Sequence, residues 1–248
     1  TQFYLDTSLG FRAPSFVDLT EQDRAAGDFV IPSLDLDPEY FVTFELGSKW
    51  QLAGDAVRGR VSGYYTILSG LLVRDPTGNL VGGLPEVRYA NAGDGYVLGF
   101  DVSLTVAPIR DLEFTLSGSY SSGEVDTPSN GRDFLSKHNP AAGRFGVRYI
   151  ALRTADADEK PRLWFELFVQ GAFKQGQLSA SDIGDTQRIP PGGTPGWVTL
   201  NFRSAFDINE TVQAFINVLN ITNTNYRIHG SGDNEPGFNL LFGFELTF

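Results

Sequence analysis

The chain has 248 residues with no cysteine and no methionine, and 30 acidic against 19 basic side chains. The absence of cysteine excludes a disulfide framework, a cysteine-based zinc site and a thiol nucleophile. The net charge of −11 argues against a nucleic-acid partner, because phosphates repel an acidic protein. No apolar run approaches the roughly 18–20 residues that a membrane-spanning helix needs. Since a processed chain of this length usually keeps internal methionines, we expect it to be a piece of a longer precursor.

Alternation of apolar and polar residues is the strongest structural signal, and this spacing places successive side chains on opposite faces of a β-strand. Between residues 96 and 106 the even positions are all apolar or aromatic, whereas the odd positions include Asp101, Ser103 and Thr105. Helical spacing has no comparable support. The alternation predicts about ten strands, near residues 1–9, 40–52, 56–71, 95–107, 112–122, 141–153, 162–175, 196–207, 211–220 and 239–248.

The connections between these strands alternate between long and short. The long ones are predicted at 10–39, 72–94, 123–140, 176–195 and 221–238, and the short ones at 53–55, 108–111, 154–161 and 208–209. In an antiparallel meander alternate connections lie at the same end, so all the long loops share one rim. Such segregation is typical of an outer-membrane β-barrel, whereas a soluble β-sandwich gives no reason for it.

The polar face of the predicted strands carries too many charges for a packed core, which favours a water-filled or plugged lumen with the apolar face toward lipid. Its charged members are Glu45, Lys49, Arg58, Arg60, Asp101, Glu113, Arg144, Arg148, Glu166 and Arg203. Trp50, Trp164 and Trp197 fall near strand ends, where we expect an aromatic girdle at the lipid headgroups; packing at strand ends is the alternative.

The last predicted strand carries an apolar stripe that ends on an aromatic residue, formed by Leu240, Phe242, Phe244, Leu246 and Phe248. This stripe resembles the signal by which the barrel-assembly machinery recognises its clients. Residues 215–248 resemble the last two strands of TonB-dependent outer-membrane receptors. The loop motif that carries the resemblance comprises Tyr226, Arg227, His229, Gly230, Asn234, Pro236 and Gly237. The sequences LGFRAPS at 9–15, LDPE at 36–39 and FELG at 44–47 match the same family in order.

The resemblance implies an all-β antiparallel transmembrane meander of about ten strands, part of a 22-stranded barrel in the outer membrane of a Gram-negative bacterium. Residues 1–248 would be the C-terminal portion of that barrel, without the plug and the TonB box. The implied activity is TonB-energised uptake of a scarce nutrient, of the siderophore, vitamin or glycan class, without a cofactor. The implied partners are the remaining barrel and plug, the TonB complex, the barrel-assembly machinery and lipopolysaccharide.

Two other readings remain open at this point. A receptor-derived barrel could act as a structural component of a larger envelope complex, without transport. A free-standing ten-stranded pore or outer-membrane hydrolase is the third reading, and it predicts that residues 1–9 pair with residues 239–248.

The sequence offers little catalytic chemistry. His138 and His229 are the two histidines, and although Ser231 and Asp233 lie near His229 in sequence, geometry rather than proximity defines a triad, so we expect no catalysis. The acidic clusters lack the spacing of a known calcium loop and are interpreted as solvated loop surface; they are Asp23/Asp28, Asp35/Asp37, Asp156/Asp158/Glu159, Asp182/Asp185 and Asp233/Glu235.

Arginines in the predicted external loops are candidate contacts for an anionic ferric chelate, because a guanidinium binds carboxylate and related oxygens in a bidentate manner. The alternative is a role in loop structure or a contact with lipopolysaccharide. The candidates chosen are Arg12, Arg132, Arg188 and Arg227, from a wider set that includes Arg24, Arg74 and Arg88.

Overall fold

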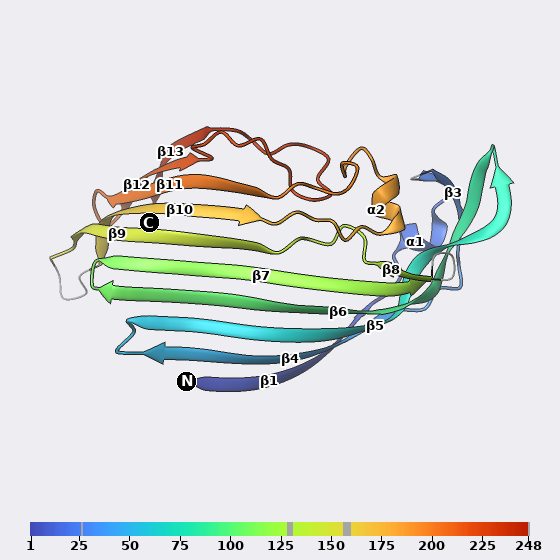
Figure 1. The fold of residues 1–248 in the computed structure, drawn as a ribbon, viewed down its shortest axis with the longest axis horizontal. Coiled ribbons are helices and arrows are strands. Elements are labelled where there is room, and N and C mark those ends of the chain that lie inside the picture. The colour runs from blue at the N-terminus through green and yellow to red at the C-terminus, as the bar shows by residue number, and fades with distance from the viewer. Residues whose placement is uncertain (26, 128–130, 156–159, 248) are drawn as a thin grey trace.

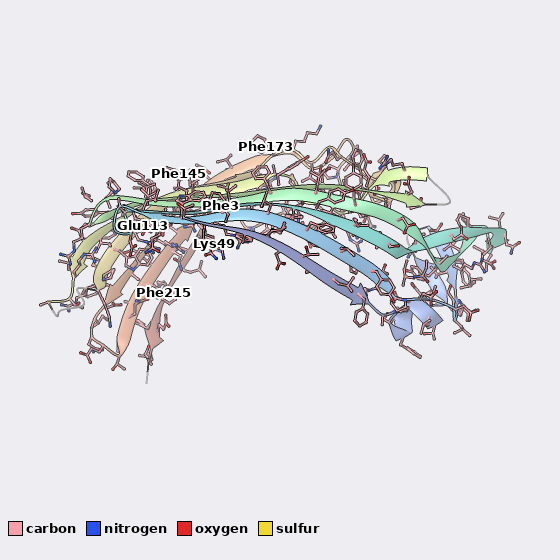
Figure 2. The ribbon with its side chains drawn as sticks, turned by 90° about the horizontal axis from the view of Figure 1, so that it is seen from below. Phe3, Lys49, Glu113, Phe145, Phe173 and Phe215 are labelled. Atoms are coloured by element: carbon pink, nitrogen blue, oxygen red, sulfur yellow. The ribbon has the colours of Figure 1, made fainter. Side chains whose placement is uncertain are left out.

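The computed structural model describes residues 1–25, 27–127, 131–155 and 160–247, and most of these residues form one β-sheet (Figure 1), which is arched when seen from its edge (Figure 2). Ten strands follow each other in chain order as an antiparallel meander, β1-β4-β5-β6-β7-β9-β10-β11-β12-β13. The short strands β2, β3 and β8 lie off this path, and β3 pairs with β6 in parallel. The predicted all-β antiparallel meander is therefore confirmed.

Each of the ten predicted strands matches one strand of the meander. The meander strands are β1 (Gln2–Arg12), β4 (Glu39–Leu52), β5 (Val57–Val81), β6 (Leu84–Ile109), β7 (Leu112–Thr127), β9 (Ala142–Arg153), β10 (Pro161–Ala172), β11 (Trp197–Asp207), β12 (Val212–Leu219) and β13 (Asn239–Leu246). The remaining elements are β2 (Asp23–Ala25), β3 (Asp28–Ile31), β8 (Gly131–Phe134), α1 (Phe16–Thr20) and α2 (Ala180–Gly184). Neither of these two described helices has the length or the apolar character to cross a membrane.

The segment 72–94 is not the loop that the sequence predicts. β5 and β6 continue through it as one long hairpin that turns at Gly82 and Gly83, whose φ angles of 59° and 84° suit a two-residue turn. Their pairing shifts register between Leu68 and Leu72 and again after Pro76, as expected of β-bulges. These irregularities break the alternation that marks a strand in the sequence, although the hairpin still supplies backbone partners.

The long connections gather at one end of the sheet and the short turns at the other (Figure 1). β1 and β13 are the two edge strands, and the described residues show no pairing between them. The free-standing ten-stranded barrel required that pairing, so the structure contradicts this reading.

The two faces of the arch differ in chemistry. Figure 2 shows Phe145 and Phe173 on the convex side and Lys49 and Glu113 on the concave side. Large apolar side chains on the convex side are strongly exposed, for example Phe3 at 77% and Phe242 at 78%. Leu240, Phe244 and Leu246 continue this surface along β13, and Phe248 lies outside the described residues. Since soluble proteins rarely expose such a continuous apolar surface, the convex face requires an apolar environment.

The tryptophans do not form the predicted girdle together. Trp50 covers Gly59 on the convex face, beside the turn between β4 and β5. Trp164 instead faces the concave side, where the guanidinium of Arg148 lies 4.6 Å from its ring centre. Trp197 packs against Tyr226, with ring centres 4.1 Å apart. The girdle prediction is therefore wrong for Trp164 and Trp197, because strand position alone does not reveal which face a ring occupies.

Candidate functional site

The concave face has a charged cluster centred on Glu166 of β10. Register places Arg148 of β9 and Arg203 of β11 directly opposite Glu166, and Arg144 lies on the same face of β9, four residues before Arg148. Arg148 and Arg203 approach the carboxylate to 3.0 and 2.7 Å, and Arg144 also pairs with it. The Glu166 side chain is only 2% exposed, whereas each of the three arginine side chains keeps about a third of its surface exposed. Three positive charges thus surround one carboxylate at the lumen wall.

Further ion pairs continue across the concave face. Arg60 lies 2.9 Å from Glu45, which also accepts a hydrogen bond of 2.6 Å from the Tyr4 hydroxyl. Arg58 lies 3.5 Å from Glu113. The polar face predicted from the sequence is therefore confirmed as a wall of paired, partly solvated charges.

The second cluster lies among the long connections and is organised by Asp182 in α2. Ser179 caps this helix in a capping box with Asp182. The Asp182 carboxylate accepts hydrogen bonds from the Ser136 hydroxyl at 2.7 Å, the Lys137 amide at 3.0 Å and the Ser179 amide at 3.1 Å. Burial raises the pKa of Asp182, but these hydrogen bonds outweigh it, so the net pKa is lowered.

Asp182 therefore ties the β10–β11 connection to the segment that precedes β9. The interpretation of Asp182 and Asp185 as solvated loop surface is wrong for Asp182, which is only 1% exposed. The cluster Asp156/Asp158/Glu159 lies outside the described residues.

A backbone bridge holds the base of the β10–β11 connection. The amides of Gln175 and Thr194 each donate to the other's carbonyl, at 3.0 and 3.1 Å. Gly193 makes the approach possible, because a Cβ at its position would lie 1.9 Å from the Gln175 carbonyl oxygen and its φ is +100°. The Gln175 side chain donates to the His138 carbonyl at 2.6 Å, so the bridge also holds the segment before β9.

His229 of the predicted family loop motif is buried against this bridge. It is 7% exposed, and its Nδ1 lies 2.8 Å from the Thr194 hydroxyl. Its Nε2 is buried without a hydrogen-bond partner among the described residues. Burial lowers the pKa of His229; the charge of Asp182 opposes the shift and that of His138 adds to it.

The rest of the motif braces the β12–β13 connection. The Tyr226 carbonyl accepts from the Glu235 amide at 2.8 Å, and the Asn220 side chain donates to the Pro236 carbonyl at 3.1 Å. The Arg227 guanidinium donates to the Asn234 side chain at 3.1 Å and reaches the carbonyl of Arg188 at 3.4 Å. The structure thus brings the motif together as a loop brace, with Gly237 beside the Asn223 side chain.

An open cavity of about 1020 Å³ lies beside these connections, between the part of the β5–β6 hairpin formed by residues 72–94 and the α2 segment. Its charged lining residues are Asp28, Arg74, Lys137, Asp185 and Arg188. Arg74 lies 3.6 Å from Asp28 and Arg188 lies 3.2 Å from Asp185. With Lys137 added, the lining carries three positive and two negative charges.

The four arginines chosen from the sequence do not converge on this cavity. Arg188 lines it, and Arg227 reaches the carbonyls of Gln187 and Arg188 beside it. Arg12 instead binds Glu39 and Asp18 at 2.6 and 2.7 Å, and Arg132 binds Glu124 at 2.7 Å. Lys137 has no signal in the sequence that marks it as a cavity residue, because only the fold brings the segment before β9 to α2.

The described residues show no catalytic triad and no metal site. The Ser231 hydroxyl donates to the Asp233 carbonyl at 2.9 Å, and the Nδ1 of His229 is paired with Thr194. Within the same part of the chain, no group of three or more His, Asp or Glu side chains is placed to hold a metal ion.

An arched meander with an apolar convex face, a charged concave face and long connections at one rim defines the wall of an outer-membrane β-barrel. Residues 1–221 match the family model described as "TonB dependent receptor-like, beta-barrel". The chain therefore belongs to the TonB-dependent receptor family, whose members are transport receptors of the Gram-negative outer membrane and not enzymes.

Solved structures agree with this fold at low sequence identity. The copper transporter OprC superposes with a TM-score of 0.76 at 16% identity, over 99% of this chain and 37% of OprC. The siderophore receptor PirA from Acinetobacter baumannii gives 0.69 at 16%, over 99% of this chain and 39% of PirA. The ferric enterobactin receptor PfeA from Pseudomonas aeruginosa, a mutant, gives 0.69 at 13%, over 99% and 38%. No curated protein sequence matches the chain. The chain thus spans little more than a third of each of these three receptors.

Proposed function

We propose that residues 1–248 form the C-terminal portion of a 22-stranded receptor barrel that takes up a scarce nutrient with energy from TonB. The proposal is supported by membership of the family and by the open cavity beside the long connections at one rim. The rest of the barrel, its plug and the TonB complex would be supplied outside this chain. The barrel-assembly machinery would recognise the apolar stripe of β13, and lipopolysaccharide would surround the convex face.

The cavity beside α2 is the observation that carries the choice of a ligand-capturing receptor over a purely structural barrel. It holds Lys137 and Arg188 at its wall, and its volume suits a ligand of several hundred daltons. The excess of one positive charge favours an anionic ligand. Among the candidate nutrients, a ferric siderophore with carboxylate or catecholate groups fits these charges best, and guanidinium and ammonium groups would bind its oxygens.

Ligand binding to outer-membrane vesicles that contain the receptor tests this function. The probes are a ferric tris-catecholate, cobalamin and a maltooligosaccharide. We expect the ferric chelate to bind, and we expect Arg188→Gln to weaken its binding by roughly 5- to 20-fold, because one charge-assisted contact is lost. Arg162→Gln at the opposite rim is the matched control, since Arg162 binds backbone carbonyls of the β11–β12 turn.

A structural role would give a different result. A barrel that serves only as a scaffold would bind none of the three probes, and Arg188→Gln would then have no measurable effect. Binding of cobalamin or of the oligosaccharide alone would support the receptor but exclude the anionic ligand.

A further inference from the structure

The β12–β13 connection rests directly on two residues of the cavity wall. A Cβ built on Gly230 would lie 3.4 Å from the side chain of Lys137, and one built on Gly232 would lie 3.4 Å from that of Arg188. Both side chains line the cavity beside α2. Residues 229–232 therefore lie against the aliphatic stems of two cations of the cavity wall.

His229 is the buried anchor of the same four residues. The residue is 7% exposed, and its Nδ1 lies 2.8 Å from the Thr194 hydroxyl. Its Nε2 lies inside the loop packing without a partner among the described residues. The imidazolium carries a proton on both ring nitrogens, and its Nε2–H would have no acceptor among the described residues.

The charges around His229 come from every segment packed against it. Asp182 in α2 and His138 on the segment before β9 act on the ring directly, while Lys137 and Arg188 lie beside Gly230 and Gly232 of its loop. Its own loop carries Arg227, Asp233 and Glu235. Asp182 is already committed to hydrogen bonds from Ser136, Lys137 and Ser179, so it is a poor new partner for the ring.

We propose that His229 is a pH-sensitive latch that holds residues 229–232 against Lys137 and Arg188 while neutral and releases them when protonated. The inference rests on the proposed function, because the cavity that the latch regulates is the proposed ligand site. Release removes the loop backbone from beside the aliphatic stems of these two side chains. Acid would therefore change access to the cavity, and the structure of the barrel wall would stay the same.

The direction of the pH effect follows from the two states of the loop. In the open loop the ring is hydrated and titrates near its usual value of about 6.5, whereas the closed loop lowers its pKa. The closed loop therefore keeps its full advantage above about pH 6.5. Below that value its population relative to the open loop falls about tenfold for each pH unit, until the lower pKa is reached. Ordinary carboxylates, with pKa values near 4, stay ionised in this window.

The absence of cysteine from the chain allows a distance measurement with two introduced labels. Ser231 and Gln187 are exposed, and Ser231→Cys with Gln187→Cys would carry spin labels in vesicles that contain the receptor, without any ligand. At pH 7.5 we expect one short distance between the labels. At pH 5.5 we expect a second, longer distance whose share grows at least severalfold.

Two histidine variants identify the group that responds. His229→Gln should abolish the difference between the two pH values, because glutamine does not titrate, whereas the matched variant His138→Gln should keep it. A pH response that persists in His229→Gln, or that disappears in His138→Gln, would overturn the proposal. Thr194→Val removes the partner of Nδ1, so the midpoint of opening should move to higher pH; an unchanged midpoint would also count against the latch.

The two proposals can fail separately in this design. Loop opening that depends on His229, without binding of any probe, would leave the latch standing and reject the proposed ligand site. Binding of the ferric chelate with a loop that ignores pH would reject the latch alone.

Discussion

Replacing Glu166 tests how strongly the charged cluster stabilises the barrel wall. Glu166→Gln leaves the guanidinium groups of Arg144, Arg148 and Arg203 together without the carboxylate that they share. Each charge-assisted hydrogen bond contributes about 1.5–3 kcal/mol, and the amide oxygen of glutamine retains part of this. Because the arginines keep 31–35% of their side-chain surface exposed, water offsets some of their repulsion. We expect a net loss of about 2–4 kcal/mol in the free energy of unfolding.

The assay is urea unfolding of the chain in lipid vesicles, followed by tryptophan fluorescence, to which Trp164 beside Arg148 contributes. Glu45→Gln is the matched control, since Glu45 pairs with one arginine and keeps 26% of its side chain exposed, so its loss should cost about 0–1 kcal/mol. Arg144→Gln added to Glu166→Gln should restore about 1 kcal/mol by reducing the repulsion. Equal losses for Glu166→Gln and Glu45→Gln would refute the view that the cluster acts as one network.

Three further predictions concern the loop rim and the lipid-facing surface. Asp182→Asn should reduce hydrogen-exchange protection of the Lys137 and Ser179 amides by about 10- to 100-fold at pH 7, since roughly 1–3 kcal/mol of charged hydrogen bonding is weakened. Because the pKa of Asp182 is lowered, its contribution should be complete above its usual value of 3.8 and disappear only as the pH falls through the lower value; an equal loss in the wild type at pH 5 would contradict this. Gly193→Ala should remove protection of the Gln175 amide, whereas Gly184→Ala, with nothing within 4 Å of the added carbon, should retain it. Phe100→Lys on the convex face should destabilise the chain in vesicles by about 2–4 kcal/mol, and Ser103→Lys on the concave face by less than about 1 kcal/mol; similar values would show that the faces are assigned wrongly.

Most of the meander could be predicted because alternation is a local property of the sequence. The alternation within residues 96–106 predicts a strand without any information about its neighbours. The register between neighbouring strands then follows from the short turns that join them. The part of the β5–β6 hairpin formed by residues 72–94 could not be predicted in this way, because Pro76 and Gly78 interrupt the alternation while the partner strand still supplies hydrogen bonds. Trp164 shows the same limit, since its strand was predicted but its concave surroundings depend on Arg148 and Arg203.

The loop rim was predicted least well, because its contacts join residues far apart in the chain. Asp182 looks like an exposed loop acid in the sequence and becomes buried only when Ser136 and Lys137 reach it. His229 was recognised as part of a family motif, but its burial depends on Thr194, 35 positions away. The arginine candidates were chosen by charge alone, and Arg12 and Arg132 instead pair with neighbouring carboxylates.

Solvent access along β6 tests the central claim, that the apolar convex face contacts lipid while the charged face lines the lumen. Single cysteines placed in turn at positions 96–106, in a chain with no cysteine of its own, would carry spin labels in outer-membrane vesicles. Oxygen, which concentrates in lipid, should broaden the signals at the even positions, and a water-soluble nickel complex should do so at odd positions such as 101 and 103. Uniform access to the nickel complex, or the opposite alternation, would contradict the assignment of the two faces.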